Sequence, residues 1–163
     1  MTPSAAAFIE TTLVDPETGA LFVLNDAERE FLEHAFELTP DGRLTHPELV
    51  FGAIKKSGKT GFAACIVIFV VRVLAGRFGE AVLCANDAEQ SVGRVFQACA
   101  RIIAASPMLT SDAVITANKI TFRSTGATIT AIASEFAGAA GSNANIVCFD
   151  ELWGFTSERS HRL

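Results

Sequence analysis

Residues 53–60 read AIKKSGKT, and this stretch decides which fold we expect. It follows a short apolar run, residues 49–51, that has the character of a strand. It leads into a helical pattern, Lys59 to about Ala75, that is apolar on nearly all sides and therefore typical of a helix buried under other layers. The stretch matches the phosphate-loop pattern except at its first position, where Ala53 replaces glycine. A strand, a loop of this kind and a buried helix in this order predict a P-loop NTPase-like α/β layered sheet.

The residue types in this loop suit the binding of a polyphosphate. Backbone N–H groups of such a loop, and of the helix that follows it, point at phosphate oxygens at the positive end of the helix dipole. Gly58 lets the backbone approach the phosphate, Lys59 adds a point charge for the terminal phosphates, and the Thr60 hydroxyl can ligate Mg²⁺. The alternative is a solvated basic turn that only resembles the motif. The residues expected to contact the nucleotide are Ala53, Ile54, Lys55, Lys56, Ser57, Gly58, Lys59, Thr60 and Gly61.

Two adjacent carboxylates follow a second apolar run. Residues 145–149 read NIVCF, which is typical of a buried parallel strand, and Asp150 and Glu151 come directly after it. Because ligands of α/β folds bind at the carboxyl ends of strands, we expect Asp150 to hold Mg²⁺ and Glu151 to act as general base for the attacking water. Glu151 and Lys59 are thus the predicted catalytic residues, and Thr60 and Asp150 are the predicted metal ligands. Taken alone, the pair is equally compatible with a strand that ends in a solvated turn.

The other patterns complete an alternation of helices and strands. They are a helix capped by Asn25 and Glu28 with apolar residues as far as Leu38, a strand over residues 81–85, a helix capped by Asn86 and Glu89, and a hairpin over residues 119–132. We divide the chain into a helical lead-in, residues 1–48, and a P-loop ATPase core, residues 49–163.

Composition excludes several classes of protein. Half of the 163 residues are hydrophobic and 19% are charged, which argues against disorder, and the net charge of −5 argues against binding DNA by overall charge. The apolar run Phe62–Val71 is too short to span a bilayer, so we expect a cytoplasmic protein without a membrane segment. Because no two histidines share a metal-ligand spacing, we interpret His34, His46 and His161 as ordinary side chains. The cysteines form no C-x-x-C pair and are expected to be reduced and buried: Cys65, Cys84, Cys99 and Cys148.

Three stretches together resemble the ATPase region of a tailed-phage terminase large subunit. They are residues 50–59, residues 84–90 and residues 149–155, and the resemblance extends over about residues 49–155. In that family the phosphate loop often lacks its first glycine and carries a basic residue before the Gly-Lys pair, as Lys55 and Lys56 do here. An Asp-Glu pair followed by a short segment with an aromatic residue is also common in the family.

The resemblance implies an activity and partners. It implies Mg²⁺-dependent ATP hydrolysis that drives phage DNA into a capsid, in the host cytoplasm, with Lys55 or Lys56 in the role of an arginine finger. The partners it implies for the full-length protein are double-stranded DNA, the portal and the small terminase subunit, with oligomerisation only at full length. The usual upstream glutamine is missing, since the first glutamine is Gln90.

The resemblance also leaves alternatives open. Only twelve residues follow Glu151, which leaves no room for the family's nuclease domain, so we expect a fragment truncated after this strand, with little turnover alone. A helicase-like P-loop ATPase fragment is one alternative, although Leu152-Trp153 does not suit it. A non-catalytic prophage remnant is the other.

Overall fold

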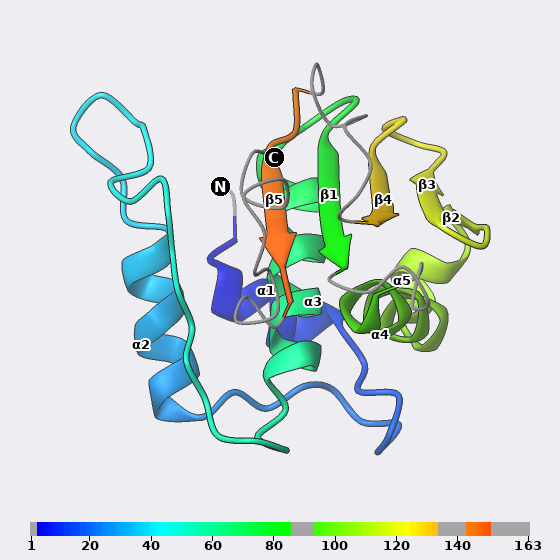
Figure 1. The fold of residues 1–163 in the computed structure, drawn as a ribbon, viewed down its shortest axis with the longest axis horizontal. Coiled ribbons are helices and arrows are strands. Elements are labelled where there is room, and N and C mark those ends of the chain that lie inside the picture. The colour runs from blue at the N-terminus through cyan, green and yellow to red at the C-terminus, as the bar shows by residue number, and fades with distance from the viewer. Residues whose placement is uncertain (1–2, 86–92, 134–142, 151–163) are drawn as a thin grey trace.

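A five-stranded mixed sheet forms the centre of the molecule (Figure 1). The computed structural model describes residues 3–85, 93–133 and 143–150. Strands β1 and β4 are parallel, β5 is parallel to β1, and β3 pairs antiparallel with both β4 and β2. This architecture confirms the predicted α/β sheet. In the order β2-β3-β4-β1-β5, the strands are β2 Ala113–Ile115, β3 Lys119–Phe122, β4 Thr128–Ala133, β1 Glu80–Ala85 and β5 Ile146–Phe149.

Helices flank this sheet and supply much of the core. They are α1 Ala5–Thr12, α2 Asp26–Ala35, α3 Lys59–Phe69 with a π-helical extension Val70–Leu74, α4 Arg94–Ala105 and α5 Pro107–Thr110. Helix α3 contacts α1, α4 and β5, which explains why its sequence is apolar on nearly all sides. Val67 and Ile68 of α3 are fully buried, as are Ile102 and Ile103 of α4. The predicted buried helix is therefore confirmed.

The predicted hairpin is confirmed, and both apolar runs form parallel strands. The predicted burial of residues 145–149 is wrong, because β5 is the edge strand of the described sheet and its residues are half-buried or exposed. Strands β3 and β4 are joined through Gly126, whose φ of 71° favours a residue without a Cβ. A Cβ at this position would also lie 2.7 Å from two ring carbons of Phe78, so the turn depends on glycine for two reasons. Strand β5 then pairs with β1 in the register Cys84↔Phe149.

Helix α2 begins where the capping pattern predicted but ends earlier. The Asn25 side chain accepts from the Glu28 N–H at 3.0 Å, and the Glu28 carboxylate accepts from the Asn25 N–H at 2.9 Å. The helix ends at Ala35, and Leu38, which was predicted to continue its apolar face, is 60% exposed. The reason is a chain reversal: Leu38 pairs with Leu44 in an antiparallel bridge instead of extending the helix.

We expect Asn25→Ala to destabilise the fold by about 1 kcal/mol, because it removes one half of this reciprocal cap. Urea unfolding followed by circular dichroism measures the change. Glu30→Ala, at an exposed position of the same helix, is the matched control and should have little effect. Equal stability of the two variants would show that the cap contributes nothing.

Three further elements differ from those predicted from the sequence, and all three are short. The predicted strand at residues 49–51 does not form, while α1 and β2 were not predicted. Asn86 and Glu89 lie outside the described residues, and α4 is described from Arg94 onward. Helix α1 packs into the same hydrophobic core as α3. The predicted boundary at residue 48, between a helical lead-in and the ATPase core, stays a prediction.

Two expectations about the chain as a whole can be compared with the described residues. None of the helices described is long and apolar enough to cross a bilayer. All four cysteines are free thiols, as expected. Cys65, Cys84 and Cys99 are buried, whereas Cys148, which was also expected to be buried, is half-buried because it lies on the edge strand β5.

Candidate functional site

The loop before α3 turns sharply, and two of its residues have left-handed backbone angles. It turns at residues 54–57, where the Ser57 N–H donates to the Ile54 carbonyl at 3.3 Å. Lys56 has a φ of 67° and Gly58 a φ of 85°, so the backbone enters the left-handed region twice within three residues. A non-glycine residue in that region is uncommon, and such positions cluster at ligand-binding sites.

The amino end of α3 is open to an anion. Gly58 is its N-cap residue and has no side chain with which to cap the first turn. The first N–H groups of a helix have no partner within the helix, so those of Lys59, Thr60 and Gly61 suit a negatively charged ligand. No acidic residue lies in this first turn, and Lys55 and Lys56 are exposed beside it. The local charge is therefore positive even though the chain is acidic overall.

An aromatic cluster fixes the segment that leads into this loop. The ring of Phe51 lies 4.9 Å from that of Phe31 on α2 and 5.0 Å from that of Phe62 on α3. Phe31 and Phe62 are also in contact, at 6.0 Å between ring centroids. Edge-to-face rings at such distances stabilise each other beyond their buried area. The sequence did not predict this aromatic contact. It predicted only that Phe51 ends the apolar run of residues 49–51.

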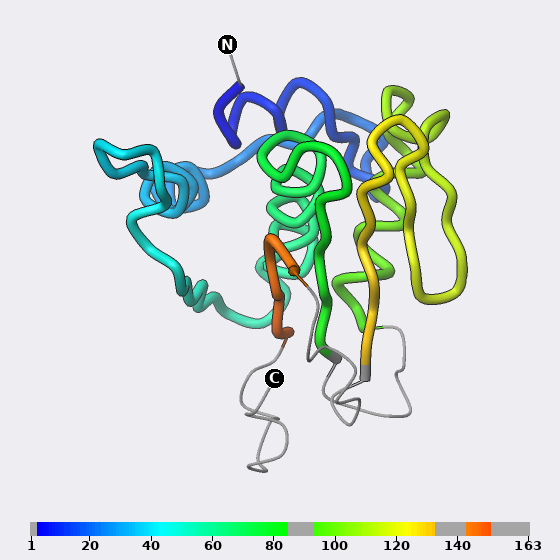
Figure 2. Tube along the Cα trace, turned by 90° about the horizontal axis from the view of Figure 1, so that it is seen from above, coloured from blue at the N-terminus to red at the C-terminus, as the bar shows by residue number. Residues whose placement is uncertain are grey.

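The segment before the loop is the main departure from the expected site. Val50 and Ile54 are each 82% exposed, and residues 48–54 pair with none of the strands that the structure describes. Figure 2 shows this part of the chain passing on the side of the molecule away from β2 and β3, where β5 is the edge strand of the described sheet. A strand needs a neighbour for its N–H and C=O groups, and this segment finds none among the described strands. The loop is therefore held by Phe51 and α3 and not by the sheet.

The acidic half of the site lies at the same edge of the sheet as the loop. Asp150 directly follows β5, and α3 contacts this strand. The carboxyl end of β5 and the amino end of α3 both point to the lower edge in Figure 1. The structure thus brings Asp150 to the side on which Lys59 and Thr60 lie. Glu151, the predicted general base, and Gln90 lie outside the described residues.

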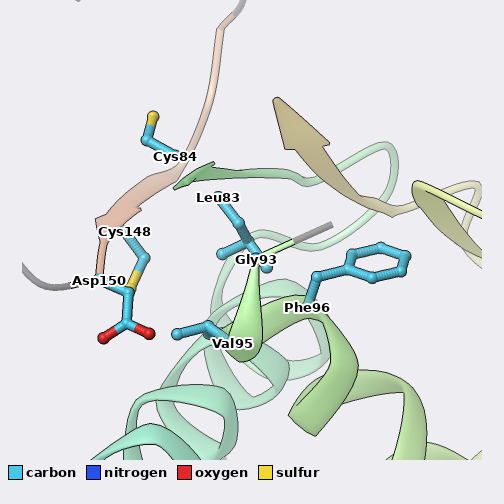
Figure 3. Close-up of a pocket in the computed structure, with 7 residues that line it drawn as sticks. All are labelled: Leu83, Cys84, Gly93, Val95, Phe96, Cys148 and Asp150. Carbon is cyan, nitrogen blue, oxygen red and sulfur yellow. The ribbon is translucent and has the colours of Figure 1, made fainter. Parts of the chain in front are cut away.

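A small hollow adjoins Asp150 (Figure 3). Asp150 lines it together with Cys148 of β5, Leu83 and Cys84 of β1, and Gly93, Val95 and Phe96 at the start of α4. Its volume is about 10 Å³, which is the space that one water molecule needs. The hollow therefore cannot hold a nucleotide, and the phosphate loop remains the candidate for that role.

One solved structure relates this fold to a known protein. The crystal structure of the HK97 bacteriophage large terminase matches 93% of this chain with a TM-score of 0.77 and 23% sequence identity. The chain has part of the fold of a phage large terminase. The resemblance inferred from the motifs is thus confirmed at the level of the fold. The chain spans 31% of the length of the HK97 protein, and no family model and no curated protein sequence matches it.

Proposed function

We propose that this chain is the ATP-binding part of a phage DNA-packaging motor of the large-terminase type. The observation that carries the proposal is the amino end of α3, whose N-cap residue, Gly58, lies in the left-handed region and has no side chain with which to cap the first turn. It lies at the same edge of the sheet as the carboxyl end of β5 (Figure 1). The terminase fold supports the same conclusion, and because the chain covers 31% of that protein, DNA packaging is proposed for the longer protein.

Each predicted residue has a role in this proposal. Residues 53–61 hold the polyphosphate, and Lys59 neutralises the charge of its terminal phosphates. Thr60 and Asp150 hold Mg²⁺, whose preference for oxygen ligands their hydroxyl and carboxylate groups satisfy. The ion supplies charge neutralisation at the transferred phosphate. Glu151 acts as general base for the attacking water, and Lys55 or Lys56 adds positive charge near the γ-phosphate.

The partners and setting follow from the same proposal. The longer protein works in the host cytoplasm as an oligomer on double-stranded DNA, with the portal and the small terminase subunit. From this chain alone we expect weak ATP binding and negligible turnover, because the segment before the loop, with Val50 and Ile54 exposed, is not held by the sheet. A site that lacks the support of a neighbouring strand is less preorganised for its ligand and has a lower affinity.

We expect the affinity for ATP to rise when Mg²⁺ is added and this gain to disappear in Asp150→Asn. The substitution keeps the size of the side chain and removes the charge that attracts the ion. Calorimetric titration with ATP, in Mg²⁺ and in a chelator, measures the gain. Asp26→Asn, at an exposed position of α2, is the matched control and should keep the full gain.

Two results would count against the proposal. A gain that persists in Asp150→Asn would remove Asp150 from the metal site. A folded wild-type chain that binds no ATP at millimolar concentration would favour the non-catalytic remnant over the packaging motor.

A further inference from the structure

Two imidazole rings and a carboxylate meet just beyond the carboxyl end of α2. The rings of His34 and His46 are in contact, with their centroids 4.0 Å apart and their planes tilted by 33°. The Nε2 atom of His46 lies 3.8 Å from Oε2 of Glu37, and one ligand atom from each of the three residues lies within 4.8 Å of the others. The histidines were interpreted as ordinary because their spacing is unusual for metal ligands. The structure shows that a chain reversal nevertheless brings the two rings together, which the spacing along the sequence did not indicate.

Backbone hydrogen bonds hold that chain reversal in place. Leu38 and Leu44 form an antiparallel bridge, and the Thr45 N–H donates to the Glu37 carbonyl at 2.9 Å. The hydrogen bond at Thr45 places the next residue, His46, beside the last turn of α2. Because the backbone already has this shape, a ligand for the three side chains would have to order only their rotamers.

The three donor groups suit a particular class of ion. Imidazole nitrogens favour zinc and the later first-row transition metals, whereas Mg²⁺ prefers an all-oxygen octahedron. Tetrahedral zinc with bonds of about 2.1 Å places neighbouring ligand atoms roughly 3.4 Å apart. The His46–Glu37 pair at 3.8 Å is near this spacing, and the other ligand atoms, which lie within 4.8 Å of one another, must close by rotation of their side chains. The carboxyl end of α2 also carries the negative end of the helix dipole, which favours a cation.

We propose that His34, Glu37 and His46 bind a divalent transition-metal ion, with Zn²⁺ the best suited, and that water completes its coordination. The ion ties the end of α2 to the start of the segment that leads to residues 53–60. This end of α2 lies at the opposite edge of the molecule from the amino end of α3 (Figure 1). The site is therefore separate from the Mg²⁺ site proposed at Thr60 and Asp150 and does not depend on it.

The thiols of the chain are poor competitors for the ion. Burial raises the pKa of Cys84 to about 11 and, with the nearby Asp150 charge as a smaller cause, that of Cys148 to about 12. Burial also raises the pKa of the Cys65 and Cys99 thiols well above the usual range. Because a metal binds the thiolate and not the thiol, these groups are largely unavailable at neutral pH.

The test is a titration of the metal-free, nitrogen-15-labelled chain with Zn²⁺, followed by calorimetry and by the imidazole signals of its three histidines. We expect the signals of His34 and His46 to shift and that of His161 to stay. His34→Gln and His46→Gln should each lower the Zn²⁺ affinity at least about tenfold, since loss of even an outer partner of a metal site costs that much. Mg²⁺ at the same concentration should shift neither ring.

Matched variants make the result specific. His161→Gln and Glu33→Gln, the latter at an exposed position of α2, should keep the wild-type affinity, whereas Glu37→Gln should lower it. A Zn²⁺ shift confined to His161 would overturn the proposal, as would equal affinities of the wild type and the His34 and His46 variants. Thiolate charge-transfer absorption with Co²⁺ would also overturn it, because it would place the ion on cysteine. The wild-type imidazole shifts identify the ligands even if a variant folds poorly.

Discussion

Lys59→Ala should lower the affinity of this chain for ATP by roughly 10- to 100-fold, because a hydrogen bond to a charged group contributes about 1.5–3 kcal/mol. Lys59 is the first residue of α3, directly after Gly58, and its side chain is partly buried. The backbone N–H groups at the start of this helix remain in the variant. We therefore expect residual weak binding and not complete loss.

The measurement is calorimetric titration with ATP in Mg²⁺, and its control is Lys119→Ala. Lys119 is an exposed residue of β3, so its substitution removes one positive charge without touching the loop. If both variants lost affinity equally, overall charge and not the loop would explain binding. If neither did, residues 53–60 would be a solvated basic turn and the proposed site would be wrong.

Phe122→Ala should cost about 4 kcal/mol of stability, the largest effect of a single substitution that we expect in the described residues. Phe122 is fully buried in β3, and removal of a buried aromatic ring typically costs 3–5 kcal/mol through lost burial and the cavity left behind. Since a whole domain is stable by only about 5–15 kcal/mol, the variant should be close to unfolding at 37 °C.

The ring also supports a polar cluster. The Arg72 guanidinium lies 4.6 Å from the ring centroid and donates to Asp112 at 2.9 Å. The Ser124 hydroxyl and N–H also donate to Asp112, and together with Arg72 they hold the pKa of this carboxyl below its usual range, against the opposing effect of burial. Loss of the ring therefore leaves Arg72 and its partners without their apolar support.

Urea unfolding checks this prediction, with Met108→Ala as the control. Met108 is an exposed residue of α5, and surface substitutions of this kind usually change stability by no more than about 0.5 kcal/mol. If Phe122→Ala lowered the free energy of unfolding by less than about 1 kcal/mol, the Phe122 ring would not be packed in the core in solution.

Much of the fold follows from patterns within a few residues. The cap at Asn25, the apolar runs of β1 and β5 and the turn at Gly126 are local signals, and each is confirmed. Asp150 directly follows β5, as the motif predicted, but β5 is half-buried to exposed and not the buried strand that its apolar sequence predicted. These features depend on hydrogen bonds and side-chain alternation between near neighbours, which a sequence shows directly.

The sequence by itself therefore determined the phosphate-loop motif, the buried helix after it and the strand before Asp150. Only the tertiary structure decided that residues 49–51 pair with no described strand, that Phe51 is anchored by two other aromatic rings, and that the rings of His34 and His46 are in contact. The physical reason is that these outcomes depend on contacts between elements. A strand exists only if a neighbour is present for its backbone, and a metal-binding cluster exists only if a turn closes at the right residue.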